Sequence, residues 1–121
     1  MIATHGLSHI SLRVADLDRS VAFYSVLFGC VEYFRDARSV QVKGPGPNDV
    51  IAFELSVSGA GATGGITHFG FRLIKPQDID TAVEQVQAAG GRLLRRGEFA
   101  AGVPFAYVVD PDGYEIEIWY E

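Results

Sequence analysis

The chain has 121 residues, of which 48% are hydrophobic and 21% charged, so it is long and apolar enough for a globular core. Its net charge of −5 argues against non-specific binding to nucleic acid, and its single cysteine, Cys30, excludes an internal disulfide. No apolar run reaches the roughly 18 residues of a transmembrane helix, and the N-terminus lacks the layout of a signal peptide. We therefore expect a cytoplasmic protein that does not enter a membrane.

The first predicted strand covers residues 7–14 and alternates apolar with polar side chains. His9 and Arg13 lie on its polar face, because alternate side chains of a strand point the same way. The same arrangement recurs 59 residues later, where His68 and Arg72 share one face of a second short strand. This repetition predicts that the chain consists of two copies of one unit.

A helix is predicted after the first strand, with Asp16 or Asp18 as its N-cap and Gly29 just beyond its end. Further strands are predicted at residues 30–35, 40–42 and 49–57. Glu54 lies inside the last of these strands. It is on the face opposite the large apolar side chains.

The second half repeats this order after a glycine-rich segment, residues 58–65. Its helix is predicted to be capped by Asp78 and to stop at Gly90. Three more strands are predicted at residues 92–96, 103–109 and 114–120. The Asp-Pro-Asp-Gly sequence at 110–113 is typical of a type I turn between the last two strands.

Each half therefore reads as a strand, a helix and three strands, which predicts an α+β protein with two βαβββ modules in tandem. The first module would cover 1–57, the joint 58–65 and the second module 66–121. A unit of about 60 residues alone has a marginal core. Pairing of the modules within one chain, or between two chains, would cover both sheets.

Each predicted module offers one histidine on its first strand and one glutamate on its last. These residues are His9 and Glu54 in the first module, and His68 and Glu117 in the second. Two imidazoles and two carboxylates suit a divalent ion such as Zn, Ni, Mn, Fe or Co. Taken singly, each residue has an ordinary structural explanation, as a strand histidine or a solvated carboxylate. The prediction of a metal site depends on the matched positions of both pairs.

Four other residues are candidates for substrate binding. Arg13 and Arg72 could each hold a carboxylate or phosphate, or instead pair with a nearby glutamate. Tyr107 could donate a hydrogen bond to a substrate oxygen or simply pack in the core, and Trp119 could form a wall of the pocket. Cys30 follows a helix-ending glycine, and we expect it to be a packed residue instead of a nucleophile.

Three segments resemble the vicinal oxygen chelate superfamily, which includes glyoxalases, bleomycin resistance proteins and extradiol dioxygenases. They are the run from His9 to Leu17, the segment from Ser20 to Gly29, and Asp-Pro-Asp-Gly-Tyr-Glu-Ile-Glu at 110–117. The resemblance covers nearly the whole chain. It implies paired βαβββ modules around a metal, with a homodimer in which each site is shared between chains.

Within that superfamily the ligand pattern is most similar to that of glyoxalase I, which implies His9, Glu54, His68 and Glu117 as ligands. Arg13 matches a basic residue that glyoxalases use on glutathione. Ser58, Gly64 and Val103 stand where that family has its other glutathione contacts, so the resemblance does not extend to them.

These observations lead to three functional hypotheses. The first is a metal-dependent lyase or isomerase, in which Glu54 or Glu117 moves a proton on a small α-oxygenated substrate. The second is a metal-free binding or resistance protein on the same scaffold. The third is an Fe(II) extradiol dioxygenase that uses two histidines and Glu117, with Glu54 left over.

Overall fold

The computed structural model describes residues 1–121, which form two compact units, Met1–Ala60 and Gly61–Glu121. Each unit is described by itself. The first contains β1 (His9–Val14), α1 (Leu17–Phe28), β2 (Val31–Arg35), β3 (Ser39–Lys43) and β4 (Val50–Leu55). The second contains β5 (Phe69–Arg72), the 3-10 turn η1 (Pro76–Asp78), α2 (Ile79–Ala88), β6 (Arg92–Ala100), β7 (Val103–Val109) and β8 (Glu115–Trp119). The predicted α+β class and the repeated βαβββ order are confirmed.

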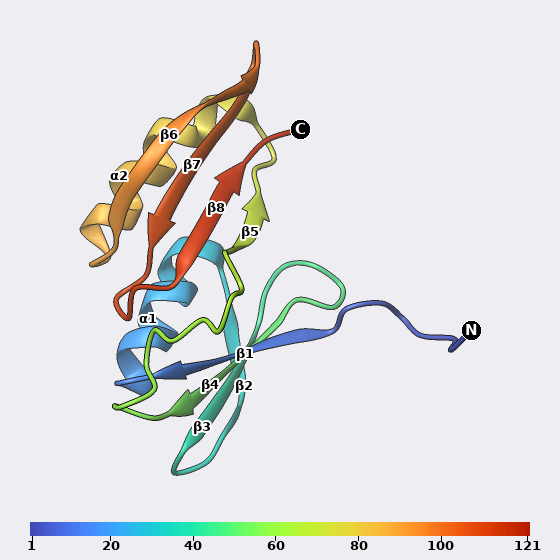
Figure 1. Ribbon diagram of the computed structural model, residues 1–121, viewed down its shortest axis with the longest axis vertical. Coiled ribbons are helices and arrows are strands. Elements are labelled where there is room, and N and C mark those ends of the chain that lie inside the picture. Colours follow the sequence, from blue (N-terminus) through green and yellow to red (C-terminus); the bar gives the residue numbers. More distant parts are fainter. The chain divides into compact units, whose positions relative to one another are not determined.

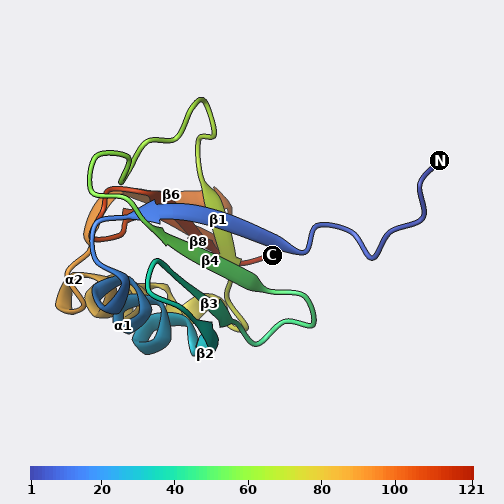
Figure 2. The ribbon, with the colours of Figure 1, turned by 90° about the horizontal axis from the view of Figure 1, so that it is seen from below.

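The first unit is a four-stranded sheet in the order β1-β4-β3-β2, with α1 along one face (Figure 2). β1 runs parallel to β4, whereas β3 is antiparallel to both of its neighbours. The N-terminal residues 1–8 extend away from the sheet (Figures 1 and 2). The crossover through α1 brings β2 back in the direction of β1, and the two antiparallel connections that follow make β4 parallel to β1.

The ends of α1 follow the sequence signals. The Asp16 side chain accepts a hydrogen bond from the Arg19 backbone N–H at 3.0 Å, which makes Asp16, and not Asp18, the N-cap. Gly29 ends the helix in the left-handed region with φ 64°, where a residue with a side chain would be strained. Both ends of α1 are therefore defined by these capping residues.

Apolar side chains between α1 and its sheet form the core of the first unit. Tyr24 is fully buried, and its ring lies 5.3 Å from that of Phe23 and 5.2 Å from that of Phe53. Other buried members come from alternate positions of the strands: Leu12, Val14, Val40, Val42 and Ile51. The residues between them, including Glu54, therefore lie on the open face of the sheet.

The second unit repeats this architecture in the order β5-β8-β7-β6, with α2 along one face (Figure 1). Its core contains Val83, Val86, Ala106, Val108, Ile116 and Ile118. At the turn before β8, the buried Asp110 carboxylate accepts hydrogen bonds from the backbone N–H groups of Asp112 and Tyr114. The turn therefore sets the register in which β8 presents Glu115 and Glu117.

Three predictions for the second unit need correction. The predicted strand 92–96 is longer and runs to Ala100, because it pairs with β7 as a long hairpin. Asp78 lies in the 3-10 turn and makes no side-chain cap hydrogen bond, since Pro76 starts the helical segment before it. The strand predicted from residue 66 begins only at Phe69, so His68 lies immediately before β5. Neither helix of the structure has both the length and the apolar composition needed to cross a membrane.

Candidate metal centre

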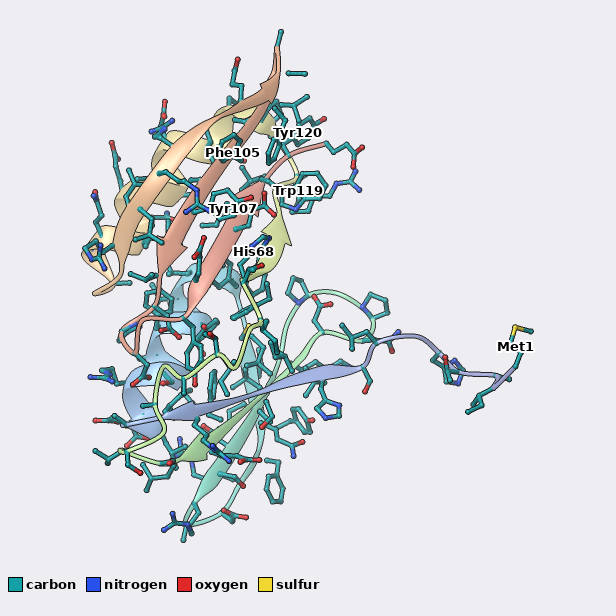
Figure 3. The ribbon with its side chains drawn as sticks, in the orientation of Figure 1. Met1, His68, Phe105, Tyr107, Trp119 and Tyr120 are labelled. Atoms are coloured by element: carbon teal, nitrogen blue, oxygen red, sulfur yellow. The ribbon has the colours of Figure 1, made fainter.

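A histidine and a glutamate meet on the open face of the second sheet. His68 Nε2 lies 3.3 Å from Glu117 Oε2, and the Glu117 side chain is only 14% exposed. Tyr107 lies directly across from Glu117 on β7, and its ring is 5.1 Å from the His68 ring, edge to face. Figure 3 shows His68 and Tyr107 close together on this sheet. The second unit thus presents an imidazole and a carboxylate side by side, with a phenol beside both.

Tyr107 is held as a neutral hydrogen-bond donor. Burial and its hydrogen bond with the Glu117 carboxylate raise the pKa of Tyr107 above its ordinary value, although the Arg95 guanidinium acts in the opposite direction. Arg95 lies over the Tyr107 ring at 4.0 Å from its centroid and forms an ion pair with Glu115. The Glu117 carboxylate therefore contacts both the Tyr107 hydroxyl and the His68 imidazole.

The corresponding residues of the first unit are not in contact. His9 is the first residue of β1, and its Nδ1 shares a hydrogen bond with the Ser8 hydroxyl at 2.8 Å. Glu54 lies on β4 and accepts a hydrogen bond from the Ser11 hydroxyl at 3.1 Å. Both side chains are exposed on the open face of the sheet, but each is bound to a different serine.

Strand register explains this difference between the two units. Glu117 lies opposite Gly70, two residues beyond His68, whereas Glu54 lies opposite Arg13, four residues beyond His9. Four residues of strand correspond to roughly 13 Å along the chain, so the backbone positions of this pair are farther apart than those of His68 and Glu117. Within neither unit does the structure gather three or more His, Cys, Asp or Glu side chains that could hold a metal ion.

Both candidate ligand histidines, His9 and His68, have a hydroxyl residue immediately before them that contacts their Nδ1. Besides the Ser8 contact with His9, the Thr67 hydroxyl lies 3.2 Å from His68 Nδ1. A Nδ1–H that donates to such a hydroxyl leaves the Nε2 lone pair free for a metal, as is common among ligating histidines. This second repeated feature could have been read from the sequence, where Ser-His and Thr-His stand at matched positions.

The remaining predicted residues lie on the open faces. Arg13 extends past Gly59, where a Cβ on the glycine would come within 2.8 Å of Arg13 Cδ, so a larger residue there would require the Arg13 side chain to move. Arg72 ends β5 in an exposed position, opposite Trp119 on β8. Trp119 and Tyr107 thus share the open face with Glu117. The sequence did not single out Ser11 and Arg95, although both lie at alternate strand positions on these faces.

Cys30 takes no part in this arrangement. Burial, with a smaller contribution from the Asp49 carboxylate, raises the pKa of Cys30 to about 11 from its usual 9.0. We predict that iodoacetamide alkylates the folded protein about 100-fold more slowly at pH 8 than the unfolded chain, because the thiolate is the reacting form. Mass spectrometry with and without denaturant measures both rates. Equal rates would show that the thiol is exposed in the native protein.

Two βαβββ units, the second with an imidazole–carboxylate pair on its open sheet face, define the class of α+β protein. Comparison with known families gives the assignment. Residues 6–118 match the model of the Glyoxalase/Bleomycin resistance protein/Dioxygenase superfamily. The chain therefore belongs to this superfamily, as the sequence motifs predicted.

The chain is 34% identical to a lactoylglutathione lyase from Haemophilus influenzae over 119 residues, which covers 90% of this chain and 87% of that protein. It is 32% identical to the lactoylglutathione lyase GLX1 of Arabidopsis thaliana over 123 residues, with 91% of this chain covered. That match spans only 42% of the plant protein, so the chain corresponds to less than half of it.

Solved structures confirm the fold. A fosfomycin resistance protein, FosX, from Listeria monocytogenes superposes with a TM-score of 0.80 at 21% identity, covering 96% of this chain and 90% of that one. That structure is a mutant in complex with Mn(II) and 1S,2S-dihydroxypropylphosphonic acid.

Proposed function

We propose that the protein is a divalent-metal-dependent enzyme that moves a proton on a small α-oxygenated substrate, as a lyase or an isomerase. The observation that carries this proposal is the His68–Glu117 pair, at 3.3 Å on an open sheet face with Tyr107 beside it. Superfamily membership and the lactoylglutathione lyases among the relatives support the same reading. The FosX structure contains Mn(II), which supports a metal on this fold. Because FosX and this chain are only 21% identical, the comparison does not extend to individual ligands.

The residues present fit a first-row divalent ion in chemistry. Imidazole nitrogen and carboxylate oxygen are ordinary ligands of Zn and its neighbours. His68 and Glu117 supply two ligands, which is too few for a protein metal site of this type. We propose that His9 and Glu54 complete the set, so that each repeat contributes one pair.

The Glu54 carboxylate already accepts a hydrogen bond from the Ser11 hydroxyl. Binding of Glu54 to the ion would replace this hydrogen bond, so the four-ligand set predicts that the Ser11 contact is lost when metal binds.

A three-ligand set is the second candidate, and the hydrogen bond from Ser11 to Glu54 favours it. His9, His68 and Glu117 would bind the ion, while Glu54 would stay bound to Ser11 and free of the metal. This set also suits the Fe(II) dioxygenase reading. A Glu54→Gln variant separates the two sets, because it retains stoichiometric metal only if Glu54 is not a ligand.

A bound divalent ion would supply Lewis acidity to a carbonyl or hydroxyl oxygen of the substrate. The chain itself would supply the proton transfer and the orientation. Glu54 or Glu117 would take the proton from the carbon next to that oxygen and return it to the neighbouring atom. Tyr107 would orient Glu117 through its hydrogen bond. Arg13 and Arg72 would hold an anionic group of the substrate.

Activity with and without metal tests the reaction class. The purified protein, stripped with a chelator and reloaded with Ni, Zn, Mn or Fe(II), is assayed for lactoylglutathione formation and, separately, for oxygen uptake with catechols. Metal-dependent lactoylglutathione formation supports the lyase, and oxygen uptake supports the dioxygenase. A protein that gains neither thermal stability nor activity with any metal would instead be the metal-free binder.

We also propose a homodimer in which each site takes one pair from each chain. Mixing His9→Ala chains with His68→Ala chains is then expected to restore metal to about half of the mixed dimer's sites, because one site regains both histidines. The measurement is metal content per chain after unfolding and refolding the mixture together. A shared site predicts recovery that neither variant shows alone, and sites within single chains predict none.

A further inference from the structure

A row of aromatic rings on the open face of the second sheet has no role in the function proposed so far. The Phe99 and Phe105 rings stack with centroids 4.3 Å apart and planes 26° from parallel. Phe105 in turn lies 5.5 Å from Tyr107, which contacts the His68 ring. Figure 3 shows Phe105, Tyr107 and His68 following one another along this sheet. We call the stacked Phe99 and Phe105 rings, with Trp119 beside them, the aromatic shelf.

The backbone is shaped to present this shelf. Gly97 lies opposite Phe105 in the hairpin, and a Cβ at that position would be only 3.1 Å from Phe105 Cζ, so the ring lies across the bare glycine. The ladder between β6 and β7 is interrupted between Glu98 and Ala100, which leaves Phe99 unpaired. Bulges of this kind redirect a side chain. Phe99 is 57% exposed, so its ring is accessible to a ligand.

The shelf is continuous with the candidate ligands. Phe105 and Trp119 are cross-strand partners, and the adjacent pair along the same two strands is Tyr107 and Glu117. Gly70 on β5 lies opposite Glu117 and has no side chain, so no β5 side chain at that position covers the Glu117 carboxylate. A molecule held at Glu117 and His68 by its oxygens would therefore extend over the shelf.

The charges around the shelf indicate which group would lie on it. Arg95 covers the Tyr107 ring, and Arg72 lies beside Trp119 at the edge of the sheet. Guanidinium groups stack on planar π systems and attract negative charge. Aromatic rings pair with other rings in offset-stacked or edge-to-face arrangements. An electron-rich aromatic group satisfies all of these contacts, whereas a short aliphatic chain satisfies none of the stacking.

We propose that the aromatic shelf binds a planar aromatic group of the substrate, next to the oxygens held at His68 and Glu117. The substrate class is then an aromatic compound with a bidentate oxygen group. The chelating half of this proposal rests on the proposed function, but the shelf itself does not need a metal.

Two hydroxamates with the same chelating group test the proposal on Zn(II)-loaded protein by calorimetry. Benzohydroxamate carries a phenyl ring and acetohydroxamate a methyl group. We expect benzohydroxamate to bind about tenfold more tightly, given the usual strength of aromatic contacts. Phe99→Ala and Phe105→Ala should each reduce that preference to about threefold or less and leave acetohydroxamate binding unchanged. Phe34→Ala, which removes an exposed ring from the first unit, is the matched control.

A second measurement without metal separates failure of the shelf from failure of the metal site. Trp119 is the only tryptophan, so its fluorescence reports 2-naphthol binding at the shelf. Quenching that weakens in Phe99→Ala and Phe105→Ala supports the shelf, even if neither hydroxamate binds and the metal site is therefore wrong. The proposal is overturned if 2-naphthol leaves Trp119 unaffected, or if both variants keep the full preference for benzohydroxamate.

Discussion

A His68→Ala variant is expected to lose stoichiometric metal and all metal-dependent activity. His68 is the imidazole that lies 3.3 Å from Glu117, and no other histidine of the second unit could replace it. Changes to residues that only support a ligand weaken metal binding by about 10- to 100-fold, so loss of a ligand itself should exceed 100-fold. Calorimetric titration of the apo-protein with Zn(II) or Ni(II) measures the loss.

The chain offers a matched control in His5. It is the third histidine, lies in the extended N-terminal segment and has no counterpart in the repeat. His5→Ala should bind metal as the unmodified protein does. If His68→Ala kept one ion per chain at unchanged affinity, the assignment of His68 as a ligand would be wrong.

A Phe53→Ala variant is expected to lose about 3–5 kcal/mol of unfolding free energy, as is usual when a fully buried phenylalanine is truncated. The Phe53 ring packs against Tyr24 at 5.2 Å, under the face of β4 that is opposite Glu54. Because small proteins have only about 5–15 kcal/mol in total, much of the protein's stability would be lost. Urea unfolding followed by circular dichroism gives the value.

Phe34→Ala is again the control, since that ring is 45% exposed on β2. Its effect should stay below about 1 kcal/mol, the usual range for surface substitutions. Similar losses in both variants would mean that Phe53 does not lie in the core between α1 and its sheet.

The sequence was sufficient for the architecture because its patterns are local. Alternation along the strands predicted that Glu54 and Glu117 lie on open faces, and the structure confirms those faces. Asp16 and Gly29 marked the ends of α1 through capping chemistry that involves only neighbouring residues. The Asp-Pro-Asp-Gly turn acts in the same way, since Asp110 binds backbone groups two and four residues ahead.

The features that the sequence did not predict depend on pairing between distant residues. Alternation has a period of two, so it cannot distinguish registers that differ by two residues, and this is the difference between the two histidine–glutamate pairs. The aromatic shelf depends on a bulge at Phe99 and on Gly97 lying opposite Phe105. Neither feature leaves a periodic signal. The prediction that ended the strand at residue 96 missed this hairpin for the same reason.

The proposed function depends above all on one ion that binds an imidazole from each repeat. X-ray absorption of the Zn(II)-loaded protein is the decisive measurement, because imidazole ligands at about 2.0–2.1 Å give a countable outer-shell signature. We predict two imidazoles per zinc in the unmodified protein and one in any zinc retained by His9→Ala. One imidazole in the unmodified protein, or an unchanged count after the His9 substitution, would contradict the shared site.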